Sequence, residues 1–290
     1  MPAIDPATLP DAAGATYTRR ALTGDIGLLV RPDGAFSPFV RFGRSYRHPN
    51  LEELLFAGPA TVGSVIPNVL VKPERGRNFD LGAKFRAGRL SGGAYFFANN
   101  YDDFIAAELV VARTAAGPLA QATNFANLRI HGLEVQADVP IVFRRGVLIL
   151  SGGTALTRGS VREGTNPLDG RSLADTPADN MTPVKVVTNV RFSDVRARWW
   201  LEYGMRAQAR VDRVALTVLD SPFLIAQDLL SLNSFAVYRF GWGFNLARGS
   251  QLAAISFAVE NLTNKYYREH FQFAPARGRS FTVGLHAGAF

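Results

Sequence analysis

Apolar and polar residues alternate with a period of two along much of the chain. The clearest stretches are residues 78–86 (NFDLGAKFR), 198–211 and 251–261, in which the apolar side chains hold one parity and the polar ones the other. Because successive side chains of a β-strand point to opposite faces of a sheet, this pattern predicts strands with one apolar and one polar face.

Weaker alternation predicts further strands, about eleven in all, and no amphipathic helix. These strands are expected near residues 23–32, 35–46, 90–105, 126–139, 146–157, 183–192, 228–240 and 279–290. The apolar parity slips within two of them, and in each a glycine lies near the slip. We therefore expect β-bulges at Gly132 and Gly288.

The segments between the predicted strands alternate between short and long. Tight turns are expected at residues 32–34, 87–89, 140–145, 193–194 and 241–249, and long loops near 47–75, 113–123, 158–181, 212–225 and 262–277. Short turns at one end and long loops at the other are typical of an outer-membrane barrel. Strands of about ten residues also match a tilted bilayer span. The pattern predicts an all-β fold, an antiparallel up-and-down transmembrane β-barrel that forms one unit.

Aromatic side chains are expected at the two water–lipid boundaries of such a barrel. Phe240, Trp242 and Phe244 are expected to bracket a short turn, and Tyr266 and Tyr267 to stand where a strand enters a long loop. A soluble β-rich binding protein is the alternative, but its apolar strand faces would be exposed to water.

Composition and charge exclude several classes of protein. The 290 residues include no Cys, which excludes disulfides, thiolate zinc sites and a Cys nucleophile. The net charge is +8, yet the arginines are dispersed at alternate positions, so nucleic-acid binding is not expected. No stretch approaches the ~18 apolar residues of a membrane-spanning helix, and the first 20 residues do not resemble a signal peptide.

Catalytic and metal-binding motifs find little support. None of the four histidines has a second histidine at metal-ligand spacing. No nucleophile lies on a strand-to-helix elbow with a base and an acid to orient it. We therefore expect no enzyme activity, no protein-built metal site and no cofactor.

Several segments, in order along the chain, resemble the β-barrel of TonB-dependent outer-membrane receptors. They are residues 43–54 (GRSYRHPNLEEL), 72–74 with 79–82 (KPE and FDLG), 127–134 (NLRIHGLE) and 259–285 (starting VENLTNKYYREH), with Phe290 as a terminal aromatic. Their order and spacing follow the family's from about residue 23 to the end. The resemblance implies a non-barrel segment over residues 1–22 and the C-terminal part of a receptor barrel over 23–290, about 11 of an expected 22 strands.

The resemblance also implies a function and a set of partners. Family members reside in the outer membrane of Gram-negative bacteria and import scarce metal chelates, and a ferric siderophore or haem is expected here. The expected partners are an N-terminal plug and the missing part of the barrel, the TonB complex acting through that plug, the metal chelate and outer-membrane lipid, with no nucleic acid. A small passive porin-like channel is the alternative function.

The strand number departs from the family. An antiparallel meander closes without a parallel seam only when the number of strands is even, and open edges in lipid leave backbone groups unsatisfied. About eleven strands therefore indicate a fragment, a truncated gene product or one part of a split barrel. A small twelve-stranded barrel remains an alternative.

Candidate substrate-binding residues come from the polar strand faces and the outer loops. The polar-face candidates are Lys84, Arg86, Arg198, Glu202, Arg206, Gln208 and Arg210, with Tyr101 and Tyr203 nearby. Cationic side chains of this kind suit an anionic metal chelate, although they would equally pair with the plug. His48 and His270 fall in outer loops, where a metal chelate or haem would be met. The predicted substrate-binding set is His48, Tyr101, Arg206, Arg210 and His270.

Overall fold

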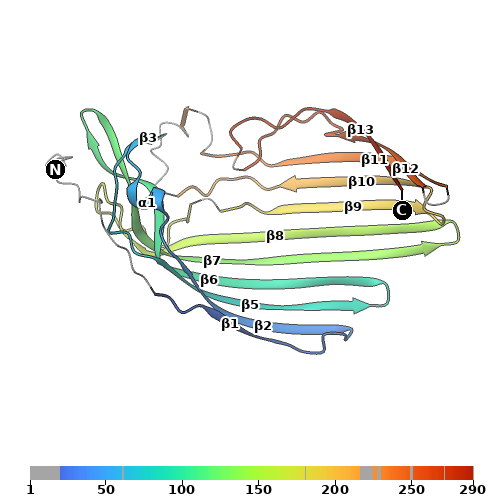
Figure 1. Ribbon diagram of the computed structural model, residues 1–290, viewed down its shortest axis with the longest axis horizontal. Coiled ribbons are helices and arrows are strands. Elements are labelled where there is room, and N and C mark those ends of the chain that lie inside the picture. Colours follow the sequence, from blue (N-terminus) through green and yellow to red (C-terminus); the bar gives the residue numbers. More distant parts are fainter. Residues whose placement is uncertain are drawn as a thin grey trace.

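Eleven strands follow one another in a single antiparallel path (Figure 1). The structure is a computed structural model, and it describes residues 20–60, 62–179, 181–215, 225–226, 230–248, 251–270 and 272–289. Each strand of the path pairs with its neighbours along the chain. The strands are β1 (Gly24–Leu29), β2 (Phe36–Arg47), β5 (Glu74–Ala87), β6 (Leu90–Thr114), β7 (Gly117–Phe143), β8 (Gly146–Gly164), β9 (Lys185–Asp194), β10 (Trp199–Gln208), β11 (Phe235–Arg248), β12 (Gln251–Glu260) and β13 (Ser280–Ala289).

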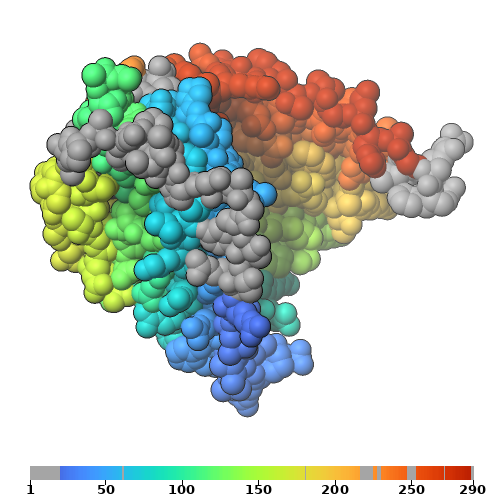
Figure 2. Space-filling model, turned by 60° about the vertical axis from the view of Figure 1, so that its left-hand side comes forward, coloured from blue at the N-terminus to red at the C-terminus, as the bar shows by residue number. Residues whose placement is uncertain are grey.

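The sheet is curved but not closed. Figure 2 shows it bending around an open hollow, and within the described residues β1 and β13 each pair with one neighbour only. The antiparallel meander confirms the predicted partial barrel. Among the described residues, no helix is both long and apolar enough to cross a membrane.

Short turns and long loops lie at opposite ends of the strands, as expected (Figure 1). Two of the predicted connections are wrong. Residues 113–123 are not a long loop, because β6 and β7 continue as a hairpin that turns at Ala115 and Ala116. Residues 241–248 belong to β11, so Trp242 lies within a strand and does not bracket a turn.

The two faces of the sheet differ in polarity. One row of directly opposed residues is apolar across six strands, and five of its six members are 39% to 62% exposed. The row consists of Leu28, Val40, Leu81, Phe96, Leu133 and Leu156. The opposite face carries polar residues such as Lys84, Gln136 and Asn189. Since lipid-facing and lumen-facing residues alternate in such barrels, we assign the apolar face to lipid and the polar face to the barrel interior.

The expected bulge at Gly132 is wrong. The register of β7 with both neighbours runs without a shift through Gly132, and the β7–β8 irregularity lies between Asn127 and Leu128. The apolar residues of β7 change from one face to the other because different parts of the strand are covered on different faces. Leu128 packs on the inner face beneath a loop, whereas Leu133 lies on the outer face.

The expected bulge at Gly288 is also wrong, because its register with Leu252 continues that of the preceding residues. Phe290 lies outside the described residues.

Two small hydrophobic cores hold the long loops at their end of the sheet. One contains Ala126, Leu128, Val161, Leu173 and Ala178, and the other Leu54, Val71, Ile105 and Ala122.

The loop between β2 and β5 contains a short helix and two short strands. The helix α1 (Leu51–Leu55) begins with a capping box made by Asn50 and Glu53. The strands β3 (Gly58–Ala60) and β4 (Gly63–Val65) form a small hairpin, and β4 pairs in parallel with β7. The pairing with β7 fixes the loop at the long-loop end of the sheet.

Candidate functional site

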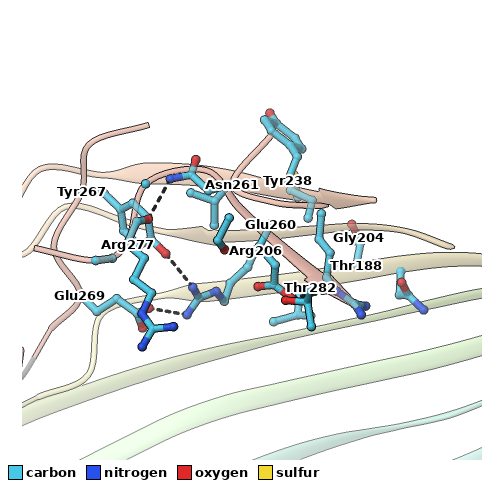
Figure 3. Close-up of a pocket in the computed structure, with 18 of the residues that line it drawn as sticks. Thr188, Gly204, Arg206, Tyr238, Glu260, Asn261, Tyr267, Glu269, Arg277 and Thr282 are labelled. Carbon is cyan, nitrogen blue, oxygen red and sulfur yellow. Dashed lines mark hydrogen bonds and ion pairs between the residues drawn. The ribbon is translucent and has the colours of Figure 1, made fainter. Parts of the chain in front are cut away.

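A cavity of about 590 Å³ lies on the inner face of β9 to β12, beneath the loop that follows β12 (Figure 3). We call residues 261–279 the clasp loop. Three arginines and three glutamates line the cavity, so its lining is charged but close to neutral. They are Arg206, Arg239, Arg277, Glu202, Glu260 and Glu269.

Arg206 of β10 holds the clasp loop against the sheet. Its Nη1 atom lies 2.6 Å from Oε1 of Glu269, and its Nη2 donates a hydrogen bond of 3.0 Å to the Tyr267 hydroxyl. The guanidinium also lies 6.0 Å from the centre of the Tyr267 ring. Figure 3 shows both side chains pointing from the loop toward Arg206. One guanidinium thus contacts the side chains of both Glu269 and Tyr267.

A ladder of alternating charges crosses the floor of the cavity from β9 to β12. Glu202 accepts hydrogen bonds from Arg191, at 3.1 Å, and from Arg239. Arg239 also donates to Glu260 at 3.1 Å. These four residues form the lumen ladder. Because each arginine in it is paired with a glutamate, the inner face here is less cationic than its arginine content alone indicates.

The base of the clasp loop is closed by the side chain of Asn261. This residue has φ +51 and is 6% exposed. Its Oδ1 accepts a hydrogen bond of 2.8 Å from the Lys265 amide, while its Nδ2 donates to the carbonyls of Lys265 at 2.8 Å and Arg277 at 3.2 Å. The side chain therefore ties the two arms of the loop together.

A second set of hydrogen bonds joins the two arms of the clasp loop at Asn264 and Arg279. The Oδ1 of Asn264 accepts a hydrogen bond of 2.8 Å from the Arg279 amide, and Arg279 Nε donates to the Leu262 carbonyl at 3.0 Å. A Cβ on Gly278 would come 2.8 Å from Asn264 Oδ1, so a larger residue would disturb this contact. The segments that resemble the receptor family at this end thus form the scaffold that aims Tyr267 and Glu269 at Arg206.

His270 follows Glu269 in the clasp loop and is half-buried. Burial of the ring, and then the positive charge of Lys185, hold the pKa of His270 below its ordinary value of 6.5. The imidazole is therefore neutral at pH 7, which is the form that binds metal ions. Among the described residues, no group of three or more His, Cys, Asp or Glu side chains is arranged to hold a metal ion.

The predicted substrate-binding residues do not converge on one place. Arg206 lines the cavity and His270 lies beside its clasp. Arg210 is exposed and lines a separate cavity of about 190 Å³. His48 is exposed and packs edge-on against Tyr46, with ring centres 4.7 Å apart.

Two tyrosines named with this set lie away from the cavity. Tyr101 is half-buried against the loop core, with its ring centre 6.4 Å from that of Phe104. Tyr203 was expected near the lumen, but it lies on the outer face, where its ring stacks on Tyr238 at 6.1 Å.

The remaining polar-face candidates divide between the cavity and other places. Glu202 lines the cavity, whereas Arg198 pairs with Asp194 at 3.0 Å beside the β9–β10 turn. Lys84 and Arg86 lie on the inner face of β5, far along the sheet from the cavity.

Sequence reasoning missed the loop half of the site. Tyr267 and Glu269 lie in the segment that resembles the receptor family, but no alternation marks them as facing Arg206. Arg239 and Glu260 do share the parity of the inner face, so the strand pattern could have identified them. Arg277 lies in the loop, where no such pattern exists.

Comparison with known proteins places the chain in one family. The family described as "TonB dependent receptor-like, beta-barrel" matches residues 5–262. No curated protein sequence matches the chain.

Solved structures of the same architecture agree. The chain is similar to the copper transporter OprC (20% identity, TM-score 0.71, covering 92% of this chain and 39% of that one). It is also similar to the FrpB iron transporter from Neisseria meningitidis (F3-3 variant; 16% identity, TM-score 0.64, covering 91% of this chain and 39% of that one). A third similar structure is the siderophore receptor PirA from Acinetobacter baumannii (16% identity, TM-score 0.63, covering 92% of this chain and 41% of that one). The chain thus spans about two fifths of these proteins. It belongs to the family of TonB-dependent receptor-like β-barrels.

Proposed function

We propose that the chain forms part of the wall of an outer-membrane transporter that imports a scarce metal chelate by energised, TonB-dependent transport. The observation that carries this proposal is the charged inner-face cavity, over which Arg206 holds the clasp loop through Glu269 and Tyr267. The similar structures include proteins named as a copper transporter, an iron transporter and a siderophore receptor, which supports a metal or its chelate as the substrate class.

The chemistry of the cavity favours an anionic chelate, with a ferric siderophore or haem as the leading candidates. An arginine guanidinium forms strong, paired hydrogen bonds with carboxylate-like oxygens. Arg206 is 43% exposed and already bound to one carboxylate, that of Glu269. A chelate with anionic oxygens can replace Glu269 on Arg206, which would couple substrate binding to release of the clasp loop. His270, neutral at pH 7, lies next in the chain to receive a metal.

The strand directions support completion of the barrel by other strands. With eleven antiparallel strands, β1 and β13 run in the same direction. An antiparallel partner at both edges requires a closing set with an odd number of strands. A second copy of this sheet in the same orientation would make two parallel seams instead. We infer that strands of different sequence close the barrel, and that the plug and its TonB contact accompany them.

The transport proposal is tested by uptake in the source bacterium under iron limitation. Strains with the gene intact or disrupted are supplied with iron-55 as a ferric catecholate or as haem, with and without a protonophore. We expect uptake of one chelate to require both the gene and the membrane potential. Gene-dependent uptake that a protonophore leaves unchanged would instead establish the passive channel.

A variant links uptake to the cavity. We expect Arg206→Met to reduce uptake of the chelate, because it removes the cation that the chelate and Glu269 share. Arg144→Met, which removes an exposed arginine of the β7–β8 turn, serves as the matched control. Equal uptake by the two variants would refute a role for the cavity.

A further inference from the structure

On the outer face of β2, β5 and β6, the apolar surface stops at a row of directly opposed residues that continues onto β7 and β8. Phe42 of β2 and Phe79 of β5 are directly opposed and are the last apolar residues of these strands before that row. The next residues on the same face, two positions toward the long loops, form a polar row. Its directly opposed members are Arg44, Arg77, Asn100, Arg129 and Ser160.

Two more arginines of the same face flank this row. Arg75 lies one level closer to the long loops, opposite Asp102, and Arg158 lies one level closer to the apolar surface, opposite His131. All five arginines are exposed. We call Arg44, Arg75, Arg77, Arg129 and Arg158 the outer arginine belt.

On β5, the belt lies where the lipid headgroups of the outer leaflet would be. From Arg77 to Ala87, at the short turn, β5 rises about 33 Å along its length. A strand tilt of roughly 40° reduces this to about 25 Å across the membrane, the height of the apolar band of such barrels. The long loops of these barrels are extracellular, so the belt faces the outer leaflet.

Few carboxylates neutralise the belt. Asp102 pairs with Arg77 at 2.9 Å and lies 3.7 Å from Arg162. Across the part of the chain that the structure describes, Arg44, Arg75 and Arg158 form no ion pair. Arg44 and Arg77 are directly opposed, an arrangement in which like charges repel. An anion from outside the chain would remove that repulsion.

We propose that the outer arginine belt binds the phosphate groups of an outer-leaflet glycolipid whose acyl chains pack on the apolar surface around Phe42 and Phe79. Paired guanidinium donors match phosphate geometry, and the belt's positive charge complements a headgroup with more than one phosphate. The site is local, because its row of directly opposed residues runs from β2 to β8 only. The inference rests on the outer-membrane location proposed above.

The experiment measures lipid binding by native mass spectrometry of the protein extracted whole from outer membranes and delipidated in mild detergent. The probes are bisphosphorylated lipid A, monophosphorylated lipid A and phosphatidylglycerol. The test variant combines Arg44→Gln, Arg77→Gln and Arg129→Gln. Its control combines Arg89→Gln, Arg144→Gln and Arg196→Gln, which remove the same charge from exposed residues of the short turns.

We expect the parent protein and the control variant to bind bisphosphorylated lipid A most strongly, and the test variant to bind it about 100-fold more weakly. The proposal is overturned if the test variant retains its affinity, if the control variant loses as much, or if phosphatidylglycerol binds equally well.

The location is checked separately. A protein absent from the outer-membrane fraction would refute the proposed function, whereas a protein present there without lipid preference would refute the belt alone. Circular dichroism and resistance to trypsin confirm that each variant is folded, so that lost binding is not lost structure.

Discussion

Replacing Asn261 by alanine should open the clasp loop without unfolding the sheet. The side chain of Asn261 makes three hydrogen bonds that join the loop's two arms, to Lys265 and Arg277. It is 6% exposed, so water cannot take over these bonds while the loop stays closed. The backbone there has φ +51, which asparagine tolerates better than alanine.

The size of the effect follows from these contacts. Each lost hydrogen bond costs about 0.5–1.5 kcal/mol, and the buried groups left without partners lie at the upper end of that range. The left-handed backbone adds about 1 kcal/mol for alanine. The closed loop should therefore lose roughly 2.5–5.5 kcal/mol relative to the open loop, which corresponds to about 70- to 10,000-fold more frequent opening. Asn261→Gly should lose less, because glycine has no penalty at positive φ.

Hydrogen exchange of the protein in lipid nanodiscs measures this directly. The amides of Lys265 and Arg279 should exchange faster by that factor in Asn261→Ala, while amides of β11 and β12 keep their rates. Asn166→Ala is the control, because it removes a similar contact with the Leu168 amide in another loop. Unchanged exchange at Lys265 in Asn261→Ala would show that the side chain does not hold the loop.

Three further predictions concern the long-loop end of the sheet. Arg206→Met should speed amide exchange in the clasp loop by about fivefold, because the half-exposed ion pair that it removes stabilises the loop by about 1 kcal/mol. The folded state lowers the pKa of His270 by burial and by the charge of Lys185, so protonation opposes closure. Closure should be strongest above pH 6.5 and weaken as the pH falls below that value, a dependence that His270→Gln should abolish. Gly159→Val should displace the loop after β8, because its side chain would overlap residues packed there, at a cost of about 1–3 kcal/mol; limited trypsin digestion would detect the exposed loop.

Each of these predictions can be contradicted. Clasp-loop exchange that is equal in Arg206→Met and in Arg144→Met would show that the ion pair contributes nothing. A pH dependence that survives in His270→Gln would assign the titration to another group. Equal trypsin resistance of Gly159→Val and Gly152→Val would be inconsistent with tight packing at Gly159, since a Cβ at Gly152 would make only ordinary contacts at 3.6 Å.

The architecture could be predicted from the sequence because a bilayer imposes a simple pattern on it. Each spanning strand must present apolar side chains to lipid, and polar ones are tolerated inside, so the period of two in residues 78–86 and 198–211 specifies both the strands and their faces. The sorting of short and long connections specifies the meander in the same way. These constraints act locally, within one strand or one connection.

The pattern fails where a strand leaves the bilayer. Leu128 and Leu133 lie on opposite faces of β7 without a bulge, because loop residues cover the inner face near Leu128 and lipid is expected at Leu133. The alternation pattern shows that both positions are apolar, but it does not distinguish a side chain covered by loop residues from one that faces lipid. The ends of β6 and β7 extend beyond the bilayer, where the alternation is lost, so the sequence predicts a loop in place of their hairpin.

The site was predicted only in part for a related reason. Arg206 follows from its place on the polar face of β10, but Glu269 reaches it from a loop that is far away in the sequence. The conformation of that loop depends on the ties made by Asn261 and Asn264, which have no periodic signature. The contact between Glu269 and Arg206 therefore cannot be predicted until the conformation of the loop is known.

The central claim is that this sheet is one part of the wall of a larger receptor barrel. The most direct test is the intact mass of the native protein in the outer-membrane fraction of the source organism, detected through a peptide of the clasp loop that includes His270. The account predicts a species well above 31.6 kDa, since the similar structures are covered over only about two fifths of their length. A species of 31.6 kDa would contradict it and would make a small self-closing or oligomeric channel the better description.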